Sequence, residues 1–163
     1  KLRYMNIKPV LIAWVALMMY MGQVGAIEVG KSMPATDIEA IQPSKGQYIY
    51  LDYWASWCGP CRQSFPWMNA LQAKYAAKGL KVVAVNVDAK RADADKFLMH
   101  TPAQFTVAHD PQGDSAKKLA IKTMPTSMLI CPEGKVLLVH AGFRTEDGAS
   151  LEAKIVAAMN GAN

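Results

Sequence analysis

Two segments in the middle of the chain have the dense apolar pattern of buried strands, and a segment of helical spacing separates them. Residues 48–54 are rich in aromatic and β-branched side chains, and residues 81–87 form a near-continuous apolar run. Between the two, apolar side chains recur at intervals of three and four, which predicts a helix over residues 61–78. The positions that set this spacing are Phe65, Met68, Leu71 and Tyr75.

Shorter elements follow toward the C-terminus. The pattern predicts helices over residues 92–99, 115–120 and 149–159, and a strand over residues 105–108. Residues 127–131 and 136–143 flank a Pro-Glu-Gly-Lys turn sequence and predict an antiparallel hairpin. Strands that alternate with helices and end in a hairpin predict an α/β fold, in which helices flank a mixed central sheet.

The N-terminus has the pattern of a targeting segment. Residues 10–21 are apolar apart from one tyrosine hydroxyl, and Lys1, Arg3 and Lys8 precede them without any acidic residue. This apolar run has the length of a signal-peptide core and is shorter than the ~20 residues of a membrane span. We therefore interpret residues 1–26 as a signal peptide cleaved before Ile27, or as a retained membrane anchor, and residues 27–163 as one exported domain.

Charge and composition add little to the prediction of one exported α/β domain once the leader is excluded. The whole chain has a net charge of +5, but three of its 18 basic residues lie in the leader. The 15 basic and 13 acidic residues that remain give a net charge of +2, without a basic stripe carrying interleaved aromatics. This composition predicts no nucleic-acid partner. Three cysteines are too few for a disulfide scaffold, whereas an exported domain can keep an individual disulfide.

Two of those cysteines lie in Trp-Cys-Gly-Pro-Cys, residues 57–61, between the first predicted strand and the helix. Cys58 falls near the helix N-terminus, where free N–H groups and the helix dipole favour a thiolate. We expect Cys58 to be exposed and to attack a substrate disulfide, and Cys61 to resolve the mixed disulfide. Pro60 suits an early helical position.

Two other interpretations of the motif stay open. A structural disulfide is one, although a loop this short restrains the unfolded chain little. A zinc site is the other, but it needs two more ligands. The remaining candidate ligands are scattered and form no second pair at zinc-like spacing: Cys131, His100, His109 and His140.

The segment 51–62, Leu-Asp-Tyr-Trp-Ala-Ser-Trp-Cys-Gly-Pro-Cys-Arg, resembles the active-site segment of the thioredoxin superfamily. Phe65-Pro66 and Met124-Pro125-Thr126 are similar to the exported TlpA/ResA branch, and the resemblance extends from about Gly46 to the C-terminus. It implies a thioredoxin fold with an N-terminal extension and thiol–disulfide exchange, with Cys58 as nucleophile and Cys61 as resolving thiol. It also implies a cis Pro125 that faces the disulfide. The substrate contacts that it implies are Trp57, Gly59, Pro60, Met124 and Thr126.

Asp52 stands out because it interrupts an apolar strand six residues before Cys58. It would face solvent if the strand lay at an edge of the sheet, whereas a buried carboxylate needs a partner or a purpose. The resemblance implies a buried acid that exchanges a proton with Cys61. Many exported relatives carry asparagine there and a glutamate three residues after the second cysteine, a position that is Ser64 here. We expect the third cysteine, Cys131, to pack in the core.

Together these features predict an exported thiol–disulfide oxidoreductase. It would act as a monomer on cysteine pairs of other exported proteins, apocytochromes c included, with electrons from a membrane dithiol carrier. No flavin, nicotinamide or haem cofactor is implied, since no phosphate-binding glycine pattern follows a strand. The rival functions are a disulfide-donating oxidant, a peroxide reductase, and a thioredoxin-fold metallochaperone that holds copper or zinc at Cys58 and Cys61.

Overall fold

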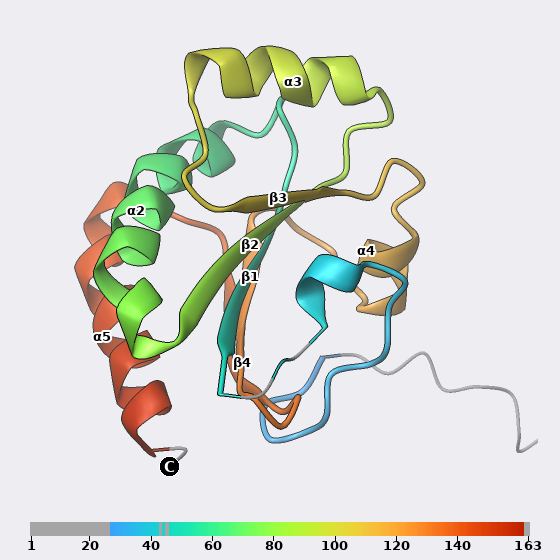
Figure 1. Ribbon diagram of the computed structural model, residues 1–163. Coiled ribbons are helices and arrows are strands. Elements are labelled where there is room, and N and C mark those ends of the chain that lie inside the picture. Colours follow the sequence, from blue (N-terminus) through green and yellow to red (C-terminus); the bar gives the residue numbers. More distant parts are fainter. Residues whose placement is uncertain (1–26, 43, 45, 162–163) are drawn as a thin grey trace, which may run out of the picture.

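The computed structural model describes residues 27–42, 44 and 46–161, so the predicted leader, residues 1–26, lies outside the described residues. Helices and strands alternate as predicted, with boundaries that shift by at most three residues (Figure 1). The elements in chain order are η1 (Glu39–Ile41), β1 (Tyr48–Trp54), α2 (Gly59–Tyr75), η2 (Ala76–Lys78), β2 (Leu80–Asn86), α3 (Arg91–His100), β3 (Thr106–His109), α4 (Asp114–Lys118), β4 (Thr126–Ile130), β5 (Val136–Ala141), η3 (Thr145–Asp147) and α5 (Gly148–Gly161).

The five strands form one mixed sheet in the order β3-β2-β1-β4-β5. The β1–β2 and β2–β3 pairs are parallel, and the β1–β4 and β4–β5 pairs are antiparallel. The predicted hairpin is confirmed, although β4 ends at Ile130 and leaves Cys131 just beyond the strand. Because β1 is the central strand and all seven of its residues are buried, both of its faces pack against other elements.

Successive β1 side chains point to opposite faces of the sheet, and each face has its own core. Tyr48, Tyr50 and Trp54 face α2 and α5, and their core includes both cysteines of the motif. Ile49, Leu51 and Tyr53 face the other way, toward η1 and the α4 region. Figure 1 shows the resulting three layers, with α2 and α5 on one side of the sheet and α4 on the other.

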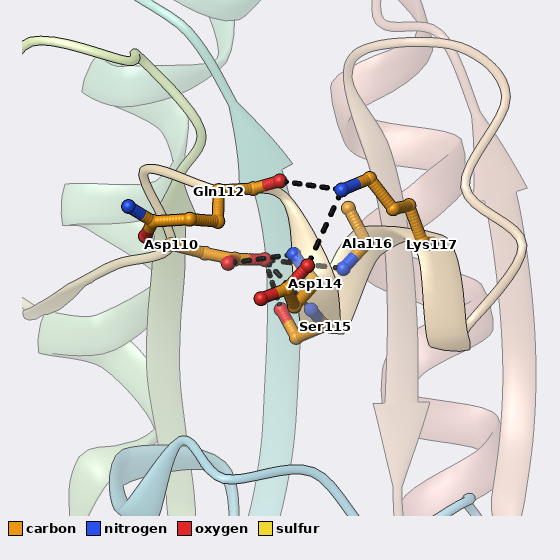
Figure 2. Close-up of polar contacts among 6 residues, drawn as sticks. All are labelled: Asp110, Gln112, Asp114, Ser115, Ala116 and Lys117. Atoms are coloured by element: carbon orange, nitrogen blue, oxygen red, sulfur yellow. Dashed lines mark hydrogen bonds and ion pairs between the residues drawn. The ribbon is translucent and has the colours of Figure 1, made fainter.

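The short helix α4 depends on one buried carboxylate. Asp110 accepts hydrogen bonds from the backbone N–H groups of Asp114, Ser115 and Ala116 at 2.9–3.2 Å, and from the Ser115 hydroxyl at 2.6 Å (Figure 2). The Ser115 hydroxyl also hydrogen-bonds Tyr53 on β1 at 2.8 Å. These contacts fix α4 against the sheet just before the segment that leads to Pro125.

The residues before η1 extend the sheet. Gly30 donates a backbone hydrogen bond to Val136, and Ser32 forms a bridge with Lys135 at the start of β5. This pairing covers part of the edge that β5 would otherwise expose. Within residues 27–42, 44 and 46–161, no helix is long and apolar enough to cross a membrane.

Candidate active site

Both cysteines of the motif lie at the N-terminus of α2, joined as a disulfide with a Cα–Cα distance of 5.3 Å. Cys58 is the N-cap residue, and the helix begins at Gly59, two residues earlier than the spacing predicts. The reason is Pro60, whose fixed φ and missing N–H suit the first helical turn. The helix thus carries Cys61 in its first turn and directs its N-terminal N–H groups toward Cys58.

The local electrostatics favour negative charge on Cys58. The backbone N–H of Cys61 donates a hydrogen bond to Cys58 Sγ at 3.2 Å. The sulfur also caps a helix of 17 residues, whose dipole places partial positive charge at this end. Both interactions would stabilise a Cys58 thiolate once the disulfide is reduced.

The prediction that Cys58 is exposed is wrong. Its exposed fraction is 5%, and that of Cys61 is 0%. Cys58 is covered because its sulfur turns inward, where it closes the ring with Cys61 and accepts the Cys61 N–H. The neighbouring Trp57, in contrast, is 67% exposed. Trp57 is therefore the exposed side chain beside the disulfide, and Cys58 itself is almost fully covered.

Asp52 lies on the central strand, with an exposed fraction of 2%, so the interpretation as a solvent-facing edge residue is excluded. It shares the face of Tyr50 and Trp54, which packs against α2 and the two cysteines. Its Oδ2 atom has no hydrogen-bond partner among the described residues. Burial raises the pKa of Asp52 well above its ordinary value, so the carboxyl group holds a proton more readily than a surface aspartate.

Ser64 occupies the helix position at which many exported relatives carry glutamate. It is buried, and its hydroxyl donates to the backbone carbonyl of Cys61 at 2.9 Å. The side chain is therefore engaged with the backbone of its own helix. Asp52 supplies the buried acid on this face instead.

The loop before β4 arrives at the same end of the sheet as the motif. Thr126 pairs with Tyr53 near the end of β1, so Pro125 lies beside the strand end that leads to Cys58. The Met124–Pro125 peptide bond is cis, as the resemblance implies. Met124 packs against the core that contains both cysteines. The Thr126 hydroxyl donates to the carbonyl of Thr123 at 2.7 Å and fixes the loop.

Our sequence reasoning missed the side chain that holds the turn before Cys58. The Asp88 carboxylate accepts hydrogen bonds from the backbone N–H of Ser56 at 2.9 Å and from the Ser56 hydroxyl at 3.1 Å. Asn86 donates to the same carboxylate at 2.7 Å. A signal was present, since Asn86 ends an apolar strand, Asp88 follows it, and the carboxyl end of that strand lies beside that of β1. Cys131 is free and buried, in line with the expected packing role.

Two surface grooves flank the motif. One lies between Trp57 and α3, and Arg62 and Lys96 contribute its basic side chains. The other lies between Pro60 and the β5–α5 region, with His140 of β5 among its lining residues.

Comparison with known proteins matches this geometry to one family. The Redoxin family model matches residues 28–155. The thiol-disulfide oxidoreductase ResA of Bacillus cereus is 32% identical over 135 residues, which cover 78% of this chain and 78% of ResA. A Chlorobium tepidum protein with the provisional name thiol:disulfide interchange protein DsbE is 52% identical in its crystal structure. That match has a TM-score of 0.75 and covers 82% of this chain and 99% of the other. StoA of Bacillus subtilis is 27% identical, with a TM-score of 0.60, over 69% of this chain and 84% of StoA.

Proposed function

Because the chain belongs to the redoxin family and is a thiol–disulfide oxidoreductase, we propose that its Cys58–Cys61 pair reduces disulfides in exported proteins, apocytochromes c awaiting haem included. One observation carries this proposal. The pair lies at the N-terminus of α2, on the sheet face of the buried Asp52, whose Oδ2 atom has no hydrogen-bond partner among the described residues. The site thus combines a stabilised nucleophile with a nearby group that can hold a proton.

The proposed reaction has two exchange steps. The Cys58 thiolate attacks one sulfur of the substrate disulfide, a mixed disulfide forms, and the first substrate thiolate leaves and takes up a proton from solvent. Cys61 then gives its proton to Asp52, and its thiolate attacks Cys58 Sγ. That attack breaks the mixed disulfide, releases the second substrate thiolate and closes the Cys58–Cys61 disulfide. The protein loses two electrons and the substrate gains them.

The residues around the pair would hold the substrate. We assign substrate contact to Trp57, Gly59 and Pro60 on one side of Cys58, and to Met124 and Thr126 on the other. Pro125 would place its loop against the substrate chain beside the reacting sulfurs. The exposure of Trp57 and the position of the Pro125 loop at the end of β1 support these assignments.

We also infer a cellular setting. The apolar N-terminal pattern supports export, with residues 1–26 as a signal peptide or a membrane anchor and residues 27–163 as the working domain. A reductase outside the cytoplasm meets an oxidising environment. Its Cys58–Cys61 disulfide must therefore be reduced again after each reaction, and a membrane dithiol carrier is the proposed electron donor. The domain would act as a monomer.

Trapping of the mixed disulfide tests the function directly. Cys61→Ser leaves Cys58 able to attack but removes the resolving thiol, so exported substrates should stay covalently attached to Cys58. Cys58→Ser is the matched control, because it keeps Cys61 and should trap nothing. Attached proteins identified by mass spectrometry would name the substrate class. Equal capture by both variants, or capture by neither, would contradict the proposed reaction.

A further inference from the structure

A row of polar side chains crosses the sheet from Asp52 toward its edge. Asp52 on β1 lies opposite Ser127 on β4, and Ser127 lies opposite His140 on β5. Residues directly opposite each other in a sheet share a face, so all three belong to the face that carries α2 and α5. On the other flank, Asp52 lies opposite Ala84 of β2, which has no polar side chain. The row therefore extends from Asp52 in one direction only.

Both ends of the row carry a polar atom without a partner. Asp52 Oδ2 and His140 Nε2 are buried and form no hydrogen bond within the described part of the chain. Buried polar atoms nearly always pair with protein groups or with ordered water. Water molecules that hydrogen-bond to Asp52 Oδ2 and His140 Nε2 would complete a chain of hydrogen bonds along the row.

Ser127 occupies the centre of the row. Its hydroxyl is buried, and its hydrogen bond to the His140 carbonyl is long, at 3.5 Å. On the β1 side, Ser127 lies directly opposite Asp52, and side chains at such positions are close neighbours on one face of the sheet. Ser127 is thus within reach of groups on both neighbouring strands, and a hydroxyl can donate and accept a hydrogen bond at once.

The far end of the row reaches the surface. His140 is half-buried and lines the groove between Pro60 and the β5–α5 region. The Asp52 side chain, in contrast, lies in the core, with an exposed fraction of only 2%. A proton that Asp52 receives from Cys61 therefore needs a route out, and this row ends at a groove beside the motif.

We propose that Ser127 and His140 are positioning residues that conduct the proton between Asp52 and this groove. The inference rests on the proposed function and adds the fate of the proton to it. After Cys61 gives its proton to Asp52, the proton passes along Ser127 and bridging water to His140 and then to solvent. No electrons move in this relay, and Asp52 returns to its carboxylate form for the next cycle.

Charged and titratable groups on four elements surround the row. Tyr50, two positions before Asp52 on β1, shares its face of the sheet, and the two cysteines of α2 belong to the core on that face. The groups that share the groove with His140 are Arg144, Asp147 and Lys154, of which Arg144 and Asp147 pair with each other at 2.9 Å. None of these belongs to the sheet row, so substitutions at Ser127 and His140 leave them in place.

The test measures the resolving step alone. Reduced protein is mixed with oxidised glutathione, the reaction is quenched with acid, and the mixed disulfide on Cys58 is followed by mass spectrometry. We expect Ser127→Ala and His140→Gln to prolong its lifetime about tenfold, which is less than the ~10²-fold or more of a direct general acid–base group, because both residues act through Asp52. The first attack by Cys58 should keep its rate. His109→Gln, on the opposite edge strand β3, is the matched control and should leave both steps unchanged.

A double-mutant cycle separates the relay from a structural role. In an Asp52→Asn background no carboxylate can take up the proton of Cys61. Ser127→Ala and His140→Gln should therefore not prolong the lifetime of the mixed disulfide further. Ser127→Thr keeps the hydroxyl and should restore the wild-type lifetime. Equal delays with and without Asp52, or no delay at all, would overturn the relay. If Ser127→Ala fails to fold, His140→Gln at the sheet edge decides the question. Failure of wild-type protein to exchange with glutathione would instead refute the proposed function.

Discussion

At the scale of single residues, the two sulfur atoms of the disulfide occupy different environments. Cys58 caps α2 and accepts a backbone N–H, whereas Cys61 is fully buried in the first turn. In the reduced protein, we therefore expect iodoacetamide to alkylate Cys58 at least about tenfold faster than Cys61, because the thiolate is the reactive form. Peptide mass spectrometry after timed quenching measures both rates. The buried Cys131 is an internal control and should react slowly. Similar rates at Cys58 and Cys61 would remove the basis for treating Cys58 as the nucleophile.

Asp52 makes a second prediction at this scale, which concerns stability. Burial raises its pKa in the folded state, so the unfolded chain loses this proton at lower pH than the folded protein does. The contribution of Asp52 to stability is therefore complete below the unfolded pKa of about 3.9 and declines as pH rises through the folded pKa. Asp52→Asn should stabilise the oxidised protein by about 1–2 kcal/mol at neutral pH, since a buried charge without a partner is removed.

Urea unfolding of the oxidised protein at several pH values measures this difference. The gain from Asp52→Asn should grow from pH 4 to pH 8 and should be accompanied by slower disulfide exchange near neutral pH. Asp37→Asn, at an exposed position, is the control and should change neither quantity. A constant stability difference across this range would show that the carboxyl group does not titrate as a buried acid.

The residues that sequence could predict are those whose signal is local. Asp52 interrupts an apolar strand, and the two cysteines and Pro60 lie within one short motif. Asp88 and His140 contribute through strand register instead. Asp88 reaches Ser56 over 32 residues, and His140 joins the Asp52 row only because β4 lies between their strands. Such contacts depend on the whole sheet, which a pattern of neighbouring residues does not specify.

At the scale of elements, α4 shows how one side chain can hold a helix in place. Five residues are too few for a stable isolated helix, so its N–H groups depend on Asp110 (Figure 2). We expect Asp110→Ala to destabilise the oxidised protein by about 2–3 kcal/mol, because several buried donors lose one charged acceptor. Asp114→Ala is the matched control: that side chain is exposed and its removal should cost less than about 0.5 kcal/mol.

Chemical denaturation of the two variants measures the difference. Redox activity per folded molecule should remain near the wild-type level for both, because α4 lies on the face of the sheet opposite the cysteines. An equal loss of stability in Asp110→Ala and Asp114→Ala would contradict the role of Asp110 as the buried cap.

Element boundaries show what the apolar pattern could and could not specify. The pattern located every strand of the sheet to within three residues, and its strongest signal came from β1, β2 and β4, which are buried along almost their whole length. It missed the start of α2 at Gly59, because Gly59 and Pro60 carry no apolar signal. It also missed the pairing of the segment around Ser32 with β5, which joins residues about a hundred positions apart through their backbones.

At the scale of the whole molecule, the topology explains why one site collects so many groups. The parallel strands β1 and β2 end at the same edge of the sheet, and β4 begins there because it runs antiparallel to β1. Consequently, three segments meet at one end of the strands: the motif after β1, the Asp88 turn after β2 and the Pro125 loop before β4. The two sulfurs lie at this end of the sheet, and Asp52 is buried on the face of β1 that packs against their core.

That arrangement also bears on the direction of electron flow. Strong disulfide oxidants stabilise their reduced thiolate, and this stabilisation raises their reduction potential. Here the described contacts to Cys58 Sγ amount to one backbone N–H and the helix terminus, without a cationic side chain. Asp52 adds a carboxyl group on the same face, and its negative charge would disfavour a second anion nearby. Both features favour the disulfide form of the protein over the dithiol form.

We therefore expect a reduction potential more negative than about −220 mV, on the thioredoxin side of the known range, which runs from about −270 mV for thioredoxin to about −120 mV for a strong periplasmic oxidant. Equilibration in glutathione and dithiothreitol buffers, with the dithiol fraction counted by mass spectrometry, measures it. Asp52→Asn provides a physical check, because loss of the buried acid should move the potential toward more oxidising values. A wild-type value near −120 mV would mean that the protein donates disulfides. A value on the reducing side requires that electrons be delivered to Cys58 and Cys61 in the oxidising compartment, since the pair would otherwise remain closed.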